Sequence, residues 1–300
     1  MPIVIKPIDP AHRPFFAGEV SGADWRKPPS PDDAEAIHRG MDEFGVLVFR
    51  DQRIDDDQQV AFSRALGPLE TATGDIAAAH ERRLSMDVND ISNLDKDNKV
   101  VARDDRRRLF GLGNQLWHSD SSFKAVPAKY SILSARVIPG EGGNTEFADM
   151  RAAYDALDEA TRREVHDLIC RHSQIFSRGI LGFTDFTEEE RIKWAPVRQR
   201  LVRRHPRTGR LSLYLASHAG EIEGWPVPEA RAFLRDLNEH ATQRRFVYAH
   251  VWRQHDIVMW DNRVTMHRAR RYDHTQVRDL HRTTLTNEVS SLEQAPPPLG

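Results

Sequence analysis

The chain of 300 residues contains 43 lysine and arginine residues against 45 aspartate and glutamate residues, a formal net charge of −2. This balance excludes the strongly basic composition with which proteins bind nucleic acids or anionic membranes. Cys170 is the only cysteine, which excludes an intrachain disulfide and any zinc site built from cysteines. No apolar run reaches the length of a transmembrane helix, and residues 1–6 lack the apolar core of a signal peptide. We therefore expect a soluble, cytoplasmic protein without nucleic-acid or membrane partners, and the sequence leaves open whether it forms a homo-oligomer.

Helix and strand signals alternate in the first hundred residues. Ser30 precedes a proline and two aspartates, which is the pattern of an N-cap followed by a first helical turn. A second helix is predicted from about Asp55 and ends at Gly67-Pro68. Strands are predicted at residues 3–5, 46–49, 84–86 and 90–92. The charged run at residues 95–108 fits either a solvated loop or a mobile lid beside a binding site.

Strands dominate the remainder of the chain. Apolar and alternating runs bounded by turn residues predict strands at 129–137, 144–147, 197–205, 211–215, 246–252, 257–260 and 280–285. Helices are predicted at 150–157, 159–170 and 228–243, with a polar insertion at 184–196. Many short strands with few helices predict a mainly β domain, a sandwich or barrel with helices packed outside. No linker divides the chain, so we expect one domain over residues 1–287 and a disordered tail at 288–300.

A histidine and an aspartate two residues apart form the first candidate site. Of the 14 histidines, only His118 has an acidic residue two positions later, Asp120. In an extended segment, residues i and i+2 face the same side, so both side chains can reach one metal ion while Ser119 points away. Two histidines and one carboxylate form the facial triad of non-haem iron oxygenases, which leaves positions open on the metal. The tripeptide alone also fits an ordinary surface turn.

A third ligand and an anion clamp are candidates near the other end of the chain. His267 follows an apolar strand and a polar turn, and would complete the triad if the fold brings it to Asp120. Arg278 and Arg282 would share one face of an extended segment, where each guanidinium can bind a carboxylate in bidentate fashion. Taken singly, the histidine also fits a hydrogen-bonded core residue, and each arginine fits surface charge. The chain has no nucleotide-binding glycine loop, serine-hydrolase elbow or His-Glu-x-x-His motif.

Several short motifs together resemble the taurine dioxygenase family of Fe(II)/2-oxoglutarate oxygenases. These motifs are residues 117–120 (WHSD), 142–145 (GGNT), 260–263 (WDNR) with His267, and the arginines 278 and 282. Further likeness, at residues 41–43, 46–50, 58–62, 114–123, 149–157 and 271–273, extends over nearly the whole chain. Within the family, the sequence looks most like the bacterial 2,4-dichlorophenoxyacetate dioxygenases. The resemblance implies a double-stranded β-helix, or jelly-roll, core.

The resemblance also implies how the chain holds its metal and its co-substrate. His118, Asp120 and His267 would bind Fe(II). Thr145 and Arg278 would hold the distal carboxylate of 2-oxoglutarate, and O2 would be the second co-substrate.

For the substrate, the resemblance implies a small carboxylate. Arg282 would bind its acid group, with Asn114 and Ser119 as further pocket contacts. The reaction would hydroxylate the carbon next to the ether oxygen of a phenoxyacetate-type herbicide, giving a phenol and glyoxylate together with succinate and CO2. Segments 71–83 and 183–194 do not clearly resemble the herbicide-degrading enzymes. The same chemistry on a sulfonate, alkyl sulfate or other small anion therefore stays open, as does a non-catalytic jelly-roll protein that binds organic acids.

Overall fold

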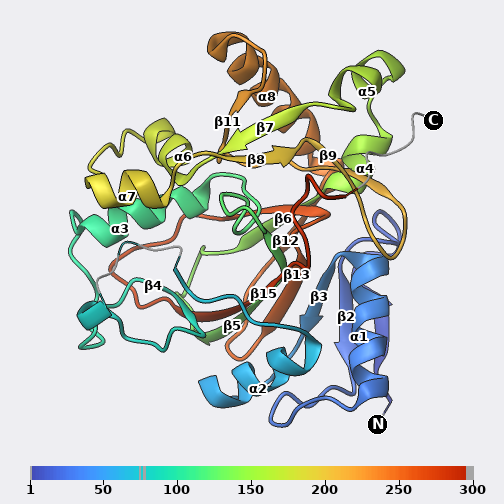
Figure 1. The fold of residues 1–300 in the computed structure, drawn as a ribbon. Coiled ribbons are helices and arrows are strands. Elements are labelled where there is room, and N and C mark those ends of the chain that lie inside the picture. Colours follow the sequence, from blue (N-terminus) through green and yellow to red (C-terminus); the bar gives the residue numbers. More distant parts are fainter. Residues whose placement is uncertain (1, 74–75, 77–78, 295–300) are drawn as a thin grey trace.

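The computed structural model describes residues 2–73, 76 and 79–294. Its centre consists of a larger and a smaller sheet with helices packed outside them (Figure 1). In spatial order, the larger sheet contains β1 (Val4–Pro7), β2 (Gly18–Ser21), β3 (Val46–Phe49), β13 (Ile257–Asp261), β5 (Ala128–Val137), β15 (Asp279–Thr286) and β4 (Asn89–Ser92). The smaller sheet contains β12 (Val247–His250), β6 (Thr145–Asp149) and β14 (Thr265–Ala269). The expected mainly β class with flanking helices is confirmed.

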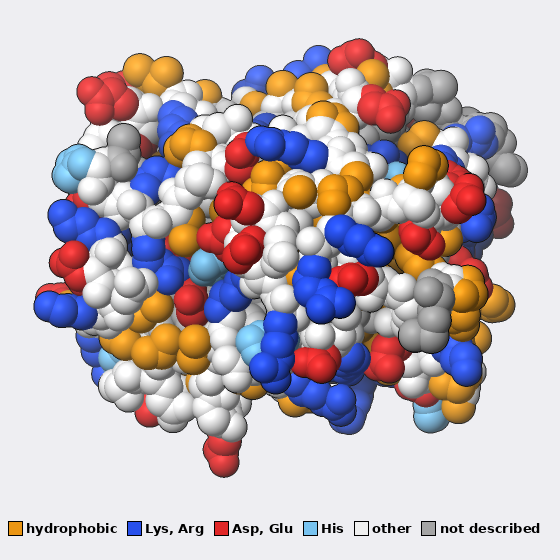
Figure 2. Space-filling view, turned by 90° about the horizontal axis from the view of Figure 1, so that it is seen from below, with side chains coloured by type: hydrophobic (Ala, Val, Ile, Leu, Met, Phe, Trp, Pro, Cys, Tyr) orange, Lys and Arg blue, Asp and Glu red, His pale blue; other side chains and the backbone are white. Residues whose placement is uncertain are grey.

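The helices and the remaining strands cover the outer sides of this pair of sheets. The helices are α1 (Pro31–Phe44), α2 (Asp56–Leu66), α3 (Arg106–Gly111), α4 (Met150–Asp155), α5 (Glu159–Val165), α6 (Gln174–Ile180), α7 (Glu188–Lys193) and α8 (Val227–Ala241). A small sheet of β11 (Ala219–Ile222), β7 (Ile169–His172) and β8 (Val197–Arg200) lies beside α8, and β9 (Val202–Arg204) pairs with β10 (Leu211–Leu213). On the face drawn in Figure 2, acidic and basic side chains are interspersed, in keeping with the near-neutral net charge.

Strand β3 shows how the layers are built, because all four of its residues are buried. Val46 and Val48 pack in a cluster with Phe147 of the smaller sheet. Leu47 and Phe49 alternate with them and pack on the other side, in a cluster with α1 and α2. A strand that is buried on both faces reads as a continuous apolar run, because successive side chains point to opposite sides. The larger sheet therefore has helices on one face and the smaller sheet on the other.

The smaller sheet places His267 between the two sheets. Met266 of β14 packs outward, in a cluster that includes Leu234 of α8. His267 follows it and so points to the opposite face. Its ring lies 4.6 Å from that of Trp260, which is on the larger sheet.

The first two predicted helices are confirmed, including the residues that begin and end them. Ser30 caps α1 by accepting a hydrogen bond from the backbone N–H of Asp33, and α1 ends at Gly45, whose φ of 67° suits a residue without a side chain. Asp55 and Gln58 form a capping box at the start of α2. Local side-chain hydrogen bonds therefore set the starts of these helices, and a glycine follows the end of each.

Three predictions of secondary structure are wrong. The helix predicted at 159–170 ends at Val165, and Cys170 lies in β7, which pairs with both β8 and β11. Pairing with neighbouring strands there outweighs the local helical pattern. Residues 84–86 form a bend and the start of a turn instead of a strand, and the single strand predicted at 197–205 is divided into β8 and β9, which join different sheets. The polar insertion at 184–196 contains the short helix α7.

The C-terminal segment expected as a tail includes a packed residue. Ser291 is fully buried, and its hydroxyl donates to Oε1 of Gln199 on β8. The same hydroxyl oxygen accepts a hydrogen bond from the backbone N–H of Arg200. Residues 295–300 of the expected tail lie outside the described residues.

His281 lies in a charged cluster between α2 and β15. Its Nδ1 is 2.5 Å from Oδ1 of Asp56 and its Nε2 is 3.1 Å from Oδ1 of Asp279, which also pairs with Arg83. Burial alone would lower the pKa of His281, but the hydrogen bonds and charges of the two aspartates outweigh it and raise this pKa. Folding therefore strengthens the binding of this proton.

This cluster predicts a pH-dependent stability. The contribution of the His281 proton to the free energy of unfolding is fully present below the unfolded pKa of about 6.5, and it is lost as the pH rises through the folded pKa. We expect the difference in Tm between the wild type and His281→Gln to be larger at about pH 6 than at about pH 9. Calorimetry across this pH range measures this difference in Tm, with a substitution at the exposed His80, His80→Gln, as control. A difference that does not change with pH would contradict the role of His281.

Candidate active site

His118 and His267, far apart in the sequence, are joined by an antiparallel bridge. The backbone N–H of His118 donates to the carbonyl of His267 at 2.9 Å, and the reciprocal bond is 2.8 Å. Asp120 completes the group, and one ligand atom from each of the three buried residues lies within 4.8 Å of the others. Nε2 of His118 and Nε2 of His267 are 3.9 and 3.7 Å from the two Asp120 carboxylate oxygens. The structure therefore brings together the three residues that the sequence analysis proposed as metal ligands.

Hydrogen bonds fix the ligand carboxylate from several sides. Ser131 of β5 donates to Oδ2 of Asp120 at 2.7 Å, and Arg282 of β15 donates to Oδ1 at 2.6 Å. The backbone N–H of Asp120 donates to the side-chain oxygen of Asn262, which also accepts from Nε1 of Trp260. Asn262 in turn donates to the Ser131 hydroxyl at 3.0 Å. Such outer partners orient metal ligands. Sequence reasoning missed Ser131 and Asn262 in this role, although Asn262 belongs to the WDNR motif.

The protonation states suit a divalent metal. Burial alone would raise the pKa of Asp120, but the charge of Arg282, aided by the hydrogen bond from Ser131, outweighs it and holds this pKa well below its usual range. Burial lowers the pKa of both histidines, and that of His267 falls well below its usual value. Nδ1 of His118 lies 2.7 Å from the carbonyl oxygen of Leu116, which leaves Nε2 facing Asp120. At neutral pH the site thus offers two neutral imidazoles and one carboxylate, a donor set that fits Fe(II).

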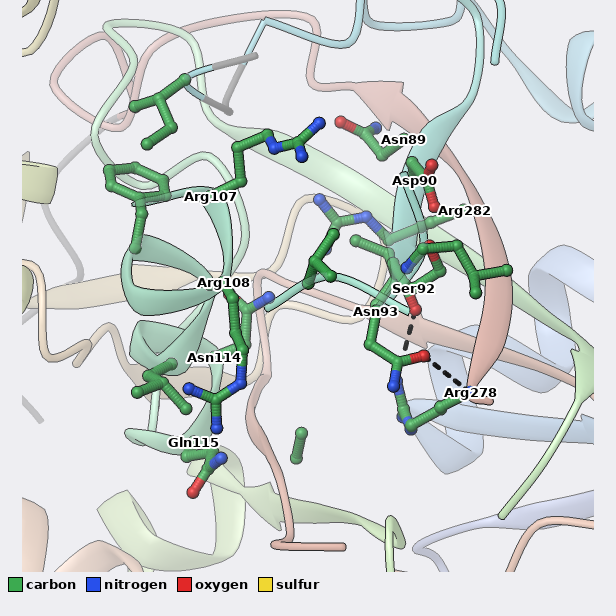
Figure 3. Close-up of a pocket in the computed structure, with 18 of the residues that line it drawn as sticks. Asn89, Asp90, Ser92, Asn93, Arg107, Arg108, Asn114, Gln115, Arg278 and Arg282 are labelled. Carbon is green, nitrogen blue, oxygen red and sulfur yellow. Dashed lines mark hydrogen bonds between the residues drawn. The ribbon is translucent and has the colours of Figure 1, made fainter. Parts of the chain in front are cut away.

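A cavity of about 850 Å³ opens beside this group, and His118, Asp120 and Asn114 are among the residues that line it. Its described lining includes ten arginines against five acidic residues, a balance that favours anionic ligands. These arginines are 82, 83, 103, 107, 108, 178, 270, 271, 278 and 282. Figure 3 shows Arg107 and Arg108 of the α3 region on one side of the cavity and Arg278 and Arg282 on the other. Part of the charged run at 95–108 therefore faces the cavity.

Arg278 is buried at one end of this cavity. Its backbone N–H donates to the Asn93 side chain at 2.8 Å (Figure 3), and its Nη2 donates to the carbonyl of Gly143 at 3.4 Å. The guanidinium lies 5.5 Å from the centre of the Tyr272 ring. A Cβ on Gly143, whose φ is 69°, would lie 3.3 Å from Nε of Arg278, so the glycine lets the backbone come close.

Two of the other candidate residues make different contacts from those expected of ligand-binding groups. The hydroxyl of Thr145 accepts a hydrogen bond from Nε1 of Trp252 at 3.0 Å. The Ser119 hydroxyl donates to the carbonyl oxygens of Leu215 and Thr265. Neither Thr145 nor Ser119 is among the described residues that line the cavity.

Comparisons with known proteins agree with this geometry. The model of the taurine catabolism dioxygenase TauD, TfdA family matches residues 5–284. The chain belongs to this family. It is therefore an Fe(II)- and 2-oxoglutarate-dependent dioxygenase, an enzyme that also uses O2.

In the part of the chain that the structure describes, no helix is both long and apolar enough to cross a membrane.

Individual relatives are similar over most of their length. An alpha-ketoglutarate-dependent 2,4-dichlorophenoxyacetate dioxygenase of Cupriavidus pinatubonensis is 46% identical over 281 residues, which cover 94% of this chain and 98% of the relative. An (S)-phenoxypropionate/alpha-ketoglutarate-dioxygenase of Delftia acidovorans is 39% identical, over 81% of this chain and 83% of its own. Among solved structures, the crystal structure of AAD-2 in complex with Mn(II) and N-oxalylglycine superposes with a TM-score of 0.93. The two sequences are 55% identical, and the match covers 97% of this chain and 100% of the AAD-2 chain.

Proposed function

We propose that this dioxygenase hydroxylates the carbon next to the ether oxygen of a phenoxyacetate-type acid such as 2,4-dichlorophenoxyacetate. The hydroxylated product is a hemiacetal, which collapses to a phenol and glyoxylate. The observation that carries the proposal is the arginine-rich cavity beside the triad of His118, Asp120 and His267. The relatives named as dioxygenases of dichlorophenoxyacetate and phenoxypropionate support this substrate class.

In this proposal, two imidazoles and one carboxylate of the triad hold the metal. When bound, Fe(II) with 2-oxoglutarate and O2 supplies the oxidising chemistry, with succinate and CO2 as co-products. The contribution of the chain is to fix the ligands, orient the acid and exclude water from the cavity. The two facing sheets support a jelly-roll core. We propose that residues 1–287 form one domain around this core, and that the enzyme is cytoplasmic.

The proposed substrate contacts differ in how far their position in the structure supports them. Arg282 lines the cavity and holds Asp120, and we propose that it also faces the acid group of the substrate. Asn114 lines the cavity four residues before His118, which supports a pocket contact. The Ser119 hydroxyl donates to backbone carbonyls and not into the cavity, so we propose that it supports the loop that carries Asp120.

We propose that Arg278 holds the distal carboxylate of 2-oxoglutarate together with Thr145, which lies two residues after the Gly143 that Arg278 contacts. We expect Arg278→Gln to raise the KM for 2-oxoglutarate by about 30-fold or more, because a charge-assisted hydrogen bond to a carboxylate contributes about 2–3 kcal/mol. Turnover at saturating 2-oxoglutarate should change far less. Succinate formation against 2-oxoglutarate concentration measures both quantities. Arg271→Gln, at an exposed arginine of the same cavity, is the control. An unchanged KM in Arg278→Gln would reject this assignment.

The proposed function is tested by anaerobic loading with Fe(II) and 2-oxoglutarate, followed by O2 and 2,4-dichlorophenoxyacetate. Succinate and phenol released in equal amounts would support it, with His118→Ala as the inactive control. Succinate with an alkyl sulfate or sulfonate but not with the phenoxyacetate would replace the substrate class and keep the chemistry. Binding of organic acids without any succinate would instead favour a non-catalytic binding protein.

A further inference from the structure

Arg178 is a second buried arginine in the cavity. It lies on α6, is 5% exposed, and lines the same cavity as His118 and Asp120. Its guanidinium carbon is 4.3 Å from the centre of the Phe110 ring, which covers one face of the planar group. Nη1 donates to the Ser177 hydroxyl at 3.0 Å, whereas the buried Nε has no hydrogen-bond partner among the described residues.

No carboxylate balances the charge of Arg178 in the described part of the chain. Burial lowers its pKa to about 9, with no opposing contribution from a nearby acid, so the side chain is still protonated at neutral pH. By contrast, Arg282, Arg83 and Arg107 of the same cavity each bond to an aspartate. Burying a cation without a counterion is costly, and a bound anion would offset that cost.

The number of such arginines matches the number of anions that need a partner. Of the described cavity arginines, only Arg178 and Arg278 are both buried and without a carboxylate. Under the proposed function, two carboxylates must be held away from the metal: the distal one of 2-oxoglutarate and the acid group of the substrate. Arg278 is assigned to the first, which leaves Arg178 for the second.

The backbone makes room for this guanidinium. Gly113, in the short helix η2 (Leu112–Gln115), approaches Arg178 so closely that a Cβ would lie 2.5 Å from the guanidinium carbon. The atoms in the way are the far end of a flexible side chain, so a methyl group there would push the guanidinium aside without disturbing the core. The position of the charge therefore depends on Gly113.

A hydrogen bond and an edge-to-face ring contact connect Arg178 to the metal-ligand triad. The Ser177 hydroxyl, which binds Arg178, also lies 2.9 Å from Nδ1 of His218. The ring of His218 is 5.9 Å from that of His118 and 5.1 Å from that of Phe123, and all three residues line the cavity. The arginine is thus held close to the ligands, beside an aromatic surface.

We propose that Arg178, alongside Arg282, binds the acid group of the aryloxyalkanoate substrate. This inference rests on the proposed function. In a phenoxyacetate the reacting carbon is bonded directly to the carboxyl carbon, so the group that holds the acid also decides which hydrogen faces the metal. Arg282 alone is a weaker partner, because Asp120 already takes up part of its charge.

The test compares an acid with its neutral amide. The protein is loaded with Mn(II) and N-oxalylglycine, and calorimetry measures the Kd of phenoxyacetate and of phenoxyacetamide. We expect Arg178→Gln to weaken phenoxyacetate binding by about 30-fold and to leave the amide nearly unchanged, since only the acid makes a charge-assisted bond. Gly113→Ala, which moves the charge without removing it, should weaken acid binding by about 5-fold on the same argument. Gly179→Ala is the matched control. Gly179 lies next to Arg178 on α6, it is exposed, and a Cβ at this position would meet nothing within 4 Å.

The outcomes separate this inference from the proposed function. Unchanged acid binding in both Arg178→Gln and Gly113→Ala would overturn the role of Arg178, even if the wild type releases phenol. Weaker binding of N-oxalylglycine, with phenoxyacetate unaffected, would also overturn it by assigning Arg178 to the co-substrate. If phenoxyacetate binds through Arg178 but the iron-loaded wild type forms no phenol, the proposed function fails and the acid-binding role stands. Because Gly113→Ala keeps the arginine, the test does not depend on Arg178→Gln folding correctly.

Discussion

Replacing Asp120 with asparagine is expected to lower turnover by more than about 100-fold, because even partners in the outer sphere of a metal site contribute about 10–100-fold. The substitution keeps the shape of the side chain but removes the negative charge that both histidines and Arg282 face. The amide is a poor metal ligand, and Arg282 loses its counterion. Metal affinity should fall together with activity.

Metal binding and turnover of Asp120→Asn are measured on the same preparation. Mn(II) binding followed by electron paramagnetic resonance reports affinity without any need for catalysis. Asp236→Asn, at an exposed aspartate of α8, is the control and should behave as the wild type. An Asp120→Asn protein that binds Mn(II) and turns over normally would reject the metal site. Asn262→Ala, which removes only an outer partner of Asp120, should give an intermediate loss of about 10-fold or more.

The largest effect on stability is expected at Asp261. This fully buried carboxylate accepts hydrogen bonds from Nε and Nη2 of Arg263 at 2.8 and 2.6 Å and lies 3.2 Å from Nε2 of His205. Although burial acts to raise the pKa of Asp261, the charge and hydrogen bonds of Arg263 hold it far below its usual range. Removing one partner of such a pair leaves an uncompensated buried charge, so Asp261→Asn should lower the free energy of unfolding by about 3–5 kcal/mol.

Urea unfolding checks this value. The exposed pair of Arg235 and Asp236 is the matched control, and Asp236→Asn should cost less than about 1 kcal/mol. Because the folded pKa of Asp261 is lowered, its contribution is fully present above pH 4 or so and is lost only on strong acidification. A difference between wild type and Asp261→Asn that persisted unchanged at low pH would show that the lost stability comes from packing.

The sequence was sufficient to predict that His118, Asp120 and His267 lie together, and to predict the class of fold. His118 and Asp120 were found from a spacing that is local, and His267 from its place after a strand and turn. The residues that hydrogen-bond to the ligand carboxylate were not predictable in this way. Ser131, for example, lies on a different segment from Asp120 and has no recognisable motif around it. The role proposed for Arg178 has no local sequence signal either, since the argument for it depends on burial and on the absence of an acid beside it among the described residues.

The errors in secondary structure have the same origin. The segment around Cys170 has an apolar spacing that suits a helix, yet it forms the central strand of a three-stranded sheet. Its two partner strands come from residues 197–200 and 219–222, which no local pattern connects to it. The helices with capping residues were predicted well because their signals lie within a few residues of one another.

The bridge between His118 and His267 has a consequence for how the protein becomes active during folding. Because the two histidines are joined only when β14 has been placed beside the loop of residue 118, a partly folded chain has no complete metal site. Metal and folding are therefore thermodynamically linked: an ion that binds only the native state raises the free energy of unfolding by RT ln(1 + [metal]/Kd). The iron supply would then raise the stability of the folded enzyme as well as its activity.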